Sequence, residues 1–241
     1  MNLMICNTPE EAAQQAAQFV IDRINAKPTA VLGLPTGGTP LGMYAELAKA
    51  VREGRADVGN ITTFNLDEYC GLPAGDPQSY YTFMRVNLYA PCGLSPAKTH
   101  IPNGPAADPD AEARAYDDAI RAAGGIDLQV LGIGHNGHIG FNEPGTSPDS
   151  RTHAVLLTEE TRRANARFFA TLDDVPTRAI TMGLQTILEA REILLIANGA
   201  DKAEILAAAL RGPVTPGNPA SLLQTHPNVT VIADAAAAAR L

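Results

Sequence analysis

The sequence predicts an α/β protein with a doubly wound, mostly parallel sheet and helices on both faces, a Rossmann-like three-layer sandwich. Short apolar runs typical of buried strands alternate along the chain with segments of helical periodicity. The composition is globular, with 45% apolar and 18% charged residues. The 241 residues suffice for one large buried core, and no linker-like stretch divides them. We therefore expect a single domain spanning residues 1–241.

Composition also restricts the partners and the compartment. A formal net charge of -8 argues against nonspecific binding to nucleic acid or to an anionic membrane. No apolar run approaches the ~20 residues needed to cross a bilayer, and the first cationic side chain is Arg23. The three cysteines, Cys6, Cys70 and Cys92, form no CxxC pattern, which indicates reduced thiols. We expect a cytoplasmic protein.

Capping residues and periodicity predict the elements in order. Thr8 and Glu11 form a capping box around Pro9, and Pro28 ends the helix that follows. The first half then holds a strand over 30–34, a helix from 40 to about 54, a strand over 61–66, a helix starting near 77 and a helix over 108–123. The second half holds a strand over 126–133, a helix from 158, a strand over 191–197, a helix to about 210, a strand over 229–232 and an alanine-rich terminal helix.

The loop over residues 35–40 joins a predicted strand to a predicted helix. Thr39 can cap that helix, and Gly37 and Gly38 leave consecutive backbone N–H groups beside its positive end. The pattern indicates an anion cradle, and the alternative is a plain strand-to-helix turn. The lysine of a Walker A loop is missing, so a nucleoside triphosphate is not indicated.

Asp67 follows the strand over 61–66, where a parallel sheet places its ligands. Because strand side chains alternate between faces, we expect Asp67 and Glu68 not to serve one pocket. An isolated aspartate at such a position also suits a turn or cap, and that alternative stays open on this feature alone.

The stretch over 130–144 is the most informative in the chain. Four glycines exclude a helix after the strand, and the loop holds His138 and Glu143. His138 can move a proton near neutral pH, and Glu143 can orient or charge it. The alternative for His138 is a hydrogen-bonded structural histidine, although its glycine- and asparagine-rich surroundings favour proton transfer.

Two cofactor readings of this loop are disfavoured. Its GxGxxG pattern does not open a helix, so a dinucleotide site is not indicated. His135, His138, Glu143 and His153 lack HExxH spacing, which disfavours a catalytic metal.

Two cations further along the chain bear on an anion site. Lys202 falls in the first turn of a predicted helix, where the dipole disfavours a cation unless an anion is shared nearby. Arg167 lies along the helix that starts at 158, in a pattern that also fits a solvated face.

Four separated motifs, at residues 35–40, 64–69, 137–144 and 165–169, make the chain resemble the glucosamine-6-phosphate deaminases nearly end to end. The first motif alone is shared with 6-phosphogluconolactonases. In those enzymes the strand-end motif typically reads Asp-Glu-Arg, whereas Tyr69 stands here.

The resemblance implies conversion of glucosamine 6-phosphate and water to fructose 6-phosphate and ammonia, without cofactor or metal. Asp67 would move the proton between C2 and C1, and His138, oriented by Glu143, would open the sugar ring. Asn136 stands in the ring-opening relay where some members carry Asp. The 6-phosphate would be held by Thr36, Gly37, Gly38, Thr39, Arg167 and Lys202.

Departures from the family pattern carry their own expectations. Allosteric members have a basic pair after the Glu-Pro stretch, where His153 and Val155 stand here, and a longer C-terminus. We expect a deaminase that needs no activator.

The polar segment over 145–177 is a candidate lid. A lactonase and a sugar-phosphate-binding regulator are the alternatives, the latter disfavoured by the absence of a DNA-reading pattern in the first 28 residues. The sequence leaves the oligomeric state open.

Overall fold

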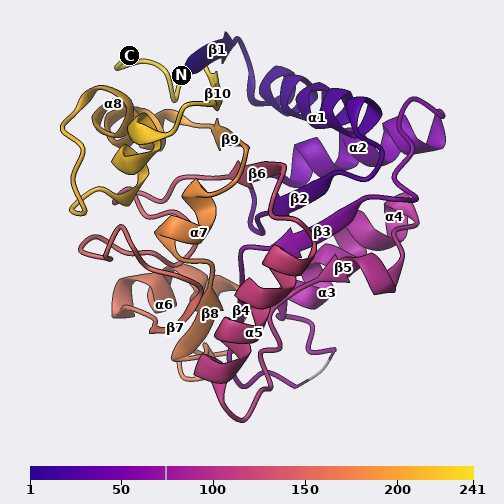
Figure 1. Ribbon diagram of the computed structural model, residues 1–241. Coiled ribbons are helices and arrows are strands. Elements are labelled where there is room, and N and C mark those ends of the chain that lie inside the picture. The colour runs from indigo at the N-terminus through magenta and orange to yellow at the C-terminus, as the bar shows by residue number, and fades with distance from the viewer. Residues whose placement is uncertain (74) are drawn as a thin grey trace.

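The computed structural model describes residues 1–73 and 75–241 (Figure 1). The strands are β1 (Asn2–Cys6), β2 (Val31–Leu34), β3 (Thr62–Asn65), β4 (Asp67–Tyr69), β5 (Thr99–His100), β6 (Leu128–Leu131), β7 (His153–Leu156), β8 (Arg178–Thr181), β9 (Glu192–Ala197) and β10 (Val229–Asp234). The α-helices are α1 (Pro9–Ala26), α2 (Leu41–Arg52), α3 (Tyr80–Met84), α4 (Ala90–Cys92), α5 (Pro109–Ala122), α6 (Glu159–Asn165), α7 (Leu184–Leu188) and α8 (Ala203–Arg211).

Seven of the strands form one sheet in the order β1-β10-β9-β6-β2-β3-β5, with every neighbouring pair parallel. Its strand order places the carboxyl ends of β2, β3 and β6 side by side. Because the loops predicted to carry chemistry follow these three strands, the topology brings them to one edge. The predicted fold class is confirmed.

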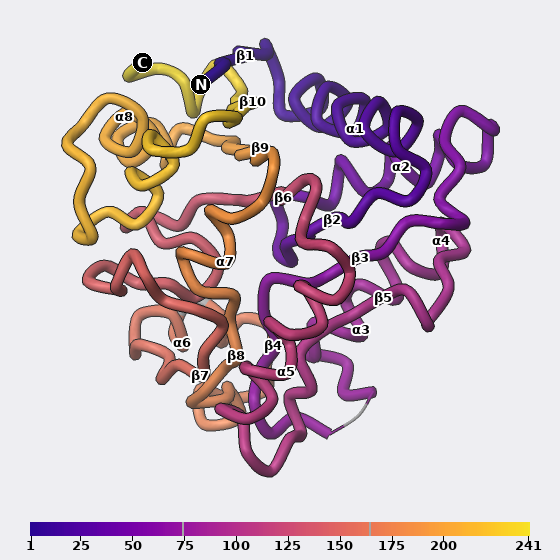
Figure 2. The backbone as a smooth tube through the Cα atoms, in the orientation of Figure 1, coloured from indigo at the N-terminus to yellow at the C-terminus, as the bar shows by residue number. Residues whose placement is uncertain are grey.

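Alternate side chains of the central strands pack into separate cores on the two faces of this sheet. Leu194 and Ile196 of β9 join the core under α1 and α2, whereas Ile193 and Leu195 join the core under α5, α7 and α8. Figures 1 and 2 show α1 and α2 packed together along one flank. Burial on both faces explains why the central strands read as continuous apolar runs.

A second, antiparallel sheet of three strands, β4-β8-β7, lies beside the larger one. Residues 67–69, which follow the predicted strand over 61–66, form a strand of their own. The chain bends at Leu66, and Asp67 to Tyr69 pair with β8 instead. This second sheet was not predicted, since β7 and β8 are only four residues long and lie among polar residues.

Most predicted helix starts agree with the structure. Oγ1 of Thr8 accepts the N–H of Glu11, and the Asp108 and Thr158 side chains cap α5 and α6. Thr39, in contrast, does not cap α2: Pro40 occupies the cap position without a side-chain hydrogen bond. The loop before α2 therefore keeps its threonine side chains free of helix capping.

Both chain ends differ from expectation. The edge strand β1 was missed, because its first four residues are exposed and its apolar run is short. The alanine-rich segment after β10 forms turns rather than the predicted helix. Oδ1 of Asp234 accepts the N–H of Ala237 at 2.7 Å, which fixes a turn, and so short a segment gains little from helix nucleation.

None of the helices described in residues 1–73 and 75–241 is both long and apolar enough to cross a membrane.

Candidate functional site

The loop between β2 and α2 forms one wall of a cavity of about 290 Å³ at the carboxyl edge of the large sheet. Gly37 has φ of +96°, a backbone conformation that L side chains rarely adopt. A Cβ built on Gly37 or Gly38 meets nothing within 4 Å, so both residues face open space. Among the described residues, no protein acceptor takes the N–H groups of Gly37, Gly38 or Thr39. The loop therefore offers free donors at the start of a helix, which suits an anion.

Asp67, the first residue of β4, lines the same cavity and is only 6% exposed. Burial, with a smaller contribution from the neighbouring charge of Glu68, raises the pKa of Asp67 to about 8. No hydrogen bond to the Asp67 carboxyl group forms within the described part of the chain. Asp67 is therefore mostly protonated at neutral pH in the free protein, and its carboxyl group has no protein partner in residues 1–73 and 75–241.

Glu68 points away from this cavity, as strand alternation predicts. Its carboxylate accepts the backbone N–H groups of Tyr69 at 2.8 Å, Tyr80 at 2.9 Å and Tyr81 at 2.8 Å. These bonds tie the start of α3 to β4. Glu68 therefore has a structural role, and it fixes Tyr80, whose ring lines the cavity beside Asp67.

The loop after β6 carries His138 to the cavity wall. The turn closes with Gly134 N–H donating to the His138 carbonyl at 2.9 Å, and Gly137 has φ of +86°. A Cβ on Gly134 would lie 2.1 Å from Cε1 of His138, so a side chain there would displace the ring. The glycines of this motif therefore create the space in which the imidazole packs.

A chain of hydrogen bonds extends behind His138. Its Nδ1 lies 2.7 Å from Oδ1 of Asn136, and Nδ2 of Asn136 donates to Oε2 of Glu143 at 2.8 Å. Oε1 of Glu143 accepts from Oγ1 of Thr161 at 2.6 Å. Nδ1 of His138 is 3.8 Å from Oε2 of Glu143, so the amide stands between the ring and the carboxylate.

This arrangement determines the protonation of the imidazole. Because the Asn136 amide nitrogen donates to Glu143, its oxygen faces His138 and can only accept. Nδ1 must therefore carry a proton, which leaves the lone pair of the neutral ring on Nε2. Burial lowers the pKa of His138, with Glu143 opposing this shift. His138 is thus a neutral proton acceptor near pH 7.

Two cations complete the cavity. Lys202, at the N-terminal cap of α8, has a side chain only 15% exposed, and burial lowers its pKa while Asp201 raises it. The guanidinium of Arg167 lies over the ring of Phe168, 4.7 Å from its centroid. Together with the glycine loop, these groups give one end of the cavity a positive character.

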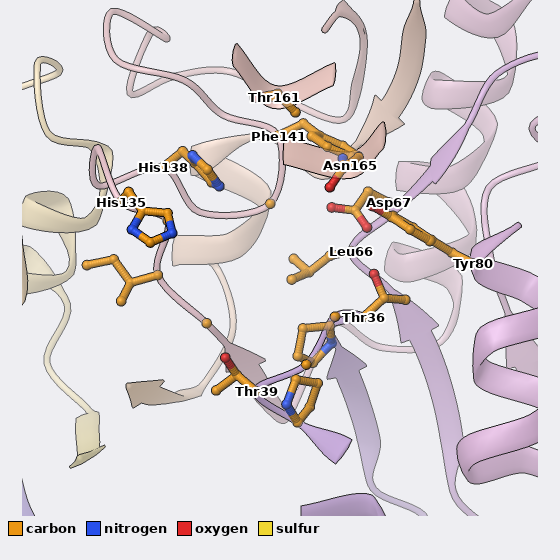
Figure 3. Close-up of a pocket in the computed structure, with 18 of the residues that line it drawn as sticks. Thr36, Thr39, Leu66, Asp67, Tyr80, His135, His138, Phe141, Thr161 and Asn165 are labelled. Carbon is orange, nitrogen blue, oxygen red and sulfur yellow. The ribbon is translucent and has the colours of Figure 1, made fainter. Parts of the chain in front are cut away.

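Figure 3 shows Asp67 and His138 on opposite sides of the cavity. Of the predicted site residues, eight line it: Thr36, Gly37, Gly38, Thr39, Asp67, His138, Arg167 and Lys202. Asn136 and Glu143 stand behind His138 rather than at the surface of the cavity. His153, considered above as a metal ligand, is placed elsewhere, on β7 with its ring against the Arg151 carbonyl.

Residues that were not among the predicted site residues also line the cavity: Tyr80, His135, Thr161 and Asn165 are examples. Thr161 and Asn165 are four positions apart on α6 and so share one face. That spacing, on a helix with a recognisable cap at Thr158, was a signal that could have found both.

Comparison with known proteins agrees with this geometry. A glucosamine-6-phosphate deaminase of Halothermothrix orenii is 51% identical over 241 residues, covering 100% of both chains. A solved structure described as a monomeric glucosamine-6-phosphate deaminase superposes with a TM-score of 0.97 at 48% identity, again covering 100% of both chains. The 6-phosphogluconolactonase of Trypanosoma brucei, at 20% identity and a TM-score of 0.78 over 100% of this chain and 98% of its own, shares the fold.

Residues 7–232 match the family described as glucosamine-6-phosphate isomerases/6-phosphogluconolactonase. The match spans both β6 with its histidine loop and the glycine loop that precedes α2. The chain belongs to this family of glucosamine-6-phosphate isomerases and 6-phosphogluconolactonases.

Proposed function

We propose that the protein converts glucosamine 6-phosphate and water to fructose 6-phosphate and ammonia. One observation carries the proposal: a buried, unpaired Asp67 and a neutral His138 line opposite sides of a cavity that also holds a glycine-rich anion loop. The deaminase relatives that match this chain over its full length support the same reaction.

Binding begins at the 6-phosphate in this proposal. The free N–H groups at Gly37, Gly38 and Thr39, with the side chain of Thr36, surround the phosphate oxygens, and Lys202 and Arg167 supply positive charge. Because the phosphate is remote from the reacting carbons, its binding energy orients C1 and C2 between Asp67 and His138.

His138 opens the pyranose ring. Its Nε2 takes the proton of the C1 hydroxyl and delivers a proton to the ring oxygen, so the imidazole ends neutral as it began. Asn136 holds the ring in the required tautomer, and Glu143 stabilises the imidazolium that forms between the two transfers. The positioning of Asn136 matches that of the orienting group in other acid–base sites.

Asp67 then performs the isomerisation. It removes the C2 proton of the open-chain aldehyde while the cationic amino group at C2 gives a proton to O1. The proton is then returned to C1, which leaves an iminium at C2 that water hydrolyses to the ketone and ammonia. The cationic amino group of the substrate lowers the pKa of Asp67 on binding, and so generates the carboxylate that this step needs. An acid–base group so placed typically contributes ~10²–10⁴-fold.

Ammonia release from glucosamine 6-phosphate by the purified, metal-stripped protein tests the proposal, with Asp67→Asn as the paired variant. We expect release by the wild type without an added cofactor, and a loss of ~10²–10⁴-fold in the variant with sugar-phosphate binding retained. Turnover of 6-phosphogluconolactone without ammonia would instead make the protein a lactonase. Binding without either reaction would make it a sugar-phosphate-binding module.

The proposal also covers regulation and location. We propose that no activator is required, because His153 and Val155 occupy the positions of the basic pair. A large rate increase on adding N-acetylglucosamine 6-phosphate would contradict this. A cytoplasmic location is proposed as well, supported by the three free cysteines, two of which are buried.

The segment over 145–177 is proposed as a lid. Three of its residues, Thr161, Asn165 and Arg167, line the cavity, so its position decides how open the site is. Bound substrate analogue should protect this segment from proteolysis. Unchanged cleavage would count against a lid.

A further inference from the structure

Asp201 lies between two basic side chains at the edge of the cavity. Its Oδ2 is 3.4 Å from Nδ1 of His135 and 3.7 Å from Nζ of Lys202. His135 and Lys202 both line the cavity, and Figure 3 shows His135 on the same side as His138. Oδ2 of Asp201 is thus shared by His135 and Lys202. Of these two, only Lys202 belongs to the proposed phosphate site.

The shared carboxylate creates a competition for Lys202. Burial disfavours the charged form of Lys202, and Asp201 is the group that counters this by supplying the opposite charge. A phosphate that pairs with Lys202 would approach the same ammonium group as Asp201. Because carboxylate and phosphate are both anionic, binding is favoured when Asp201 moves off Lys202.

The backbone around Asp201 is fixed, so the side chain is the part that can move. Both carboxylate oxygens of the buried Asp234 accept the N–H of Gly199, at 3.1 and 3.0 Å. Gly199 has φ of +94°, and a Cβ there would lie 2.6 Å from Oδ1 of Asp201. The turn therefore requires glycine at position 199 and leaves room for the Asp201 side chain beside it.

We propose that Asp201 competes with the substrate phosphate for Lys202, and that His135 relieves the competition by holding Asp201. Both are positioning residues, since neither needs to touch the substrate. The inference rests on the phosphate position in the proposed function. It adds a determinant of substrate affinity that lies outside the phosphate-binding groups themselves.

A double-mutant cycle on KM for glucosamine 6-phosphate tests the pair. Asp201→Asn removes the competitor and should lower KM, whereas His135→Ala leaves Asp201 on Lys202 and should raise it. Each change should be about two- to fivefold, the size expected of a partly exposed ion pair, and should fall on KM rather than on kcat. In the Asp201→Asn background, His135→Ala should have no further effect, because its role acts through Asp201.

A charge-matched control separates this local effect from a general change of field. Glu204→Gln removes one negative charge from the first turn of α8, three residues after Asp201, at a side chain paired with Arg240 and 88% exposed. KM should be unchanged in this variant. Inorganic phosphate as a competitive inhibitor provides a second readout, and its inhibition constant should follow the same pattern across the cycle.

The outcomes of these experiments test the role of Asp201 and His135 separately from the proposed phosphate position. Lys202→Met should raise KM more than about tenfold if Lys202 binds phosphate through a charge-assisted hydrogen bond. An unchanged KM in that variant would overturn the phosphate position and the inference together. A raised KM there, with additive effects of His135→Ala and Asp201→Asn, would overturn the inference alone. An equal fall of KM in Glu204→Gln and Asp201→Asn would also overturn it.

Discussion

Oδ1 of Asn136 lies 2.7 Å from Nδ1 of His138, and this contact decides which nitrogen of the imidazole is free to act. An aspartate at the same position would place a second carboxylate beside Glu143. The asparagine instead transmits orientation without adding charge. Asn136 therefore orients the imidazole, whereas the charge of Glu143 raises its pKa.

Asn136→Asp should raise the pKa of His138, because a carboxylate in direct contact stabilises the imidazolium. The rise is followed by the NMR chemical shift of the imidazole ring during a pH titration of the wild type and the variant. Asn136→Ala is the companion variant, which removes the orienting group without adding charge. An unchanged pKa in Asn136→Asp would show that the amide does not govern the ring.

The pH dependence of kcat/KM should report Asp67. Since the base must be ionised and its pKa in the free protein is raised to about 8, kcat/KM should rise with pH until it levels near that value. In the pH profile of kcat, the rise should occur at lower pH, because the cationic amino group of the bound substrate lowers the pKa of Asp67. A kcat/KM that is constant between about pH 6 and pH 8 would exclude Asp67 as the ionising base.

Asp67 should also make stability depend on pH. The folded protein holds the Asp67 proton up to about pH 8, whereas the unfolded chain loses it near 3.8, so the free energy of unfolding falls as pH rises between these values. Asp67→Asn cannot ionise and should escape this loss. We expect the variant to be more stable than the wild type by on the order of 5 kcal/mol above pH 8, measured by urea unfolding.

Below about pH 3.8, the wild type and Asp67→Asn should have similar free energies of unfolding. Asp67 is then protonated in both the folded and the unfolded wild type. A variant that is less stable at every pH would mean that the Asp67 carboxyl group makes stabilising contacts that the amide cannot replace.

Thr161→Val should weaken the support of Glu143 without changing the size of the side chain. The Thr161 hydroxyl donates to Oε1 of Glu143 at 2.6 Å, and its loss leaves a half-buried carboxylate oxygen without that donor. We expect kcat to fall about tenfold, equivalent to ~1.4 kcal/mol. Thr161→Ser keeps the hydroxyl and should retain most of the activity, so equal losses in the two variants would point to packing instead.

The five central strands of the large sheet, β10, β9, β6, β2 and β3, were predicted because they are buried on both faces, whereas the edge strands β1 and β5 were missed. The sequence also located the loop at His138 and the aspartate at residue 67, whose residue types are unusual at strand ends. The small sheet was missed, since its strands are short, and the bend at Leu66 depends on pairing with β8, far along the chain. Local pattern contains no signal for such a partner.

Within the site, sequence reasoning placed the groups that face the cavity better than those that support them. The position of Asn136 between His138 and Glu143 is a product of how the loop turns at Gly137. Likewise, the contact of Asp201 with Lys202 and His135 joins two loops that are distant in sequence. Such contacts depend on tertiary structure, which periodicity and capping do not encode.

The three-stranded sheet links Asp67 to the helix α6 at the wall of the cavity. Asp67 is paired in register with Thr181 of β8, and Thr181 is paired on its other side with His153 of β7. The strand β7 leads directly to α6, which bears Thr161 and Asn165. Asp67 and the α6 residues that line the cavity are therefore connected through the three-stranded sheet. The loop over 35–40 and the loop that carries His138 extend from the seven-stranded sheet. The distance between the proposed base and the proposed phosphate site therefore depends on how the two sheets are aligned, and a substitution in β8, away from the cavity, would alter it.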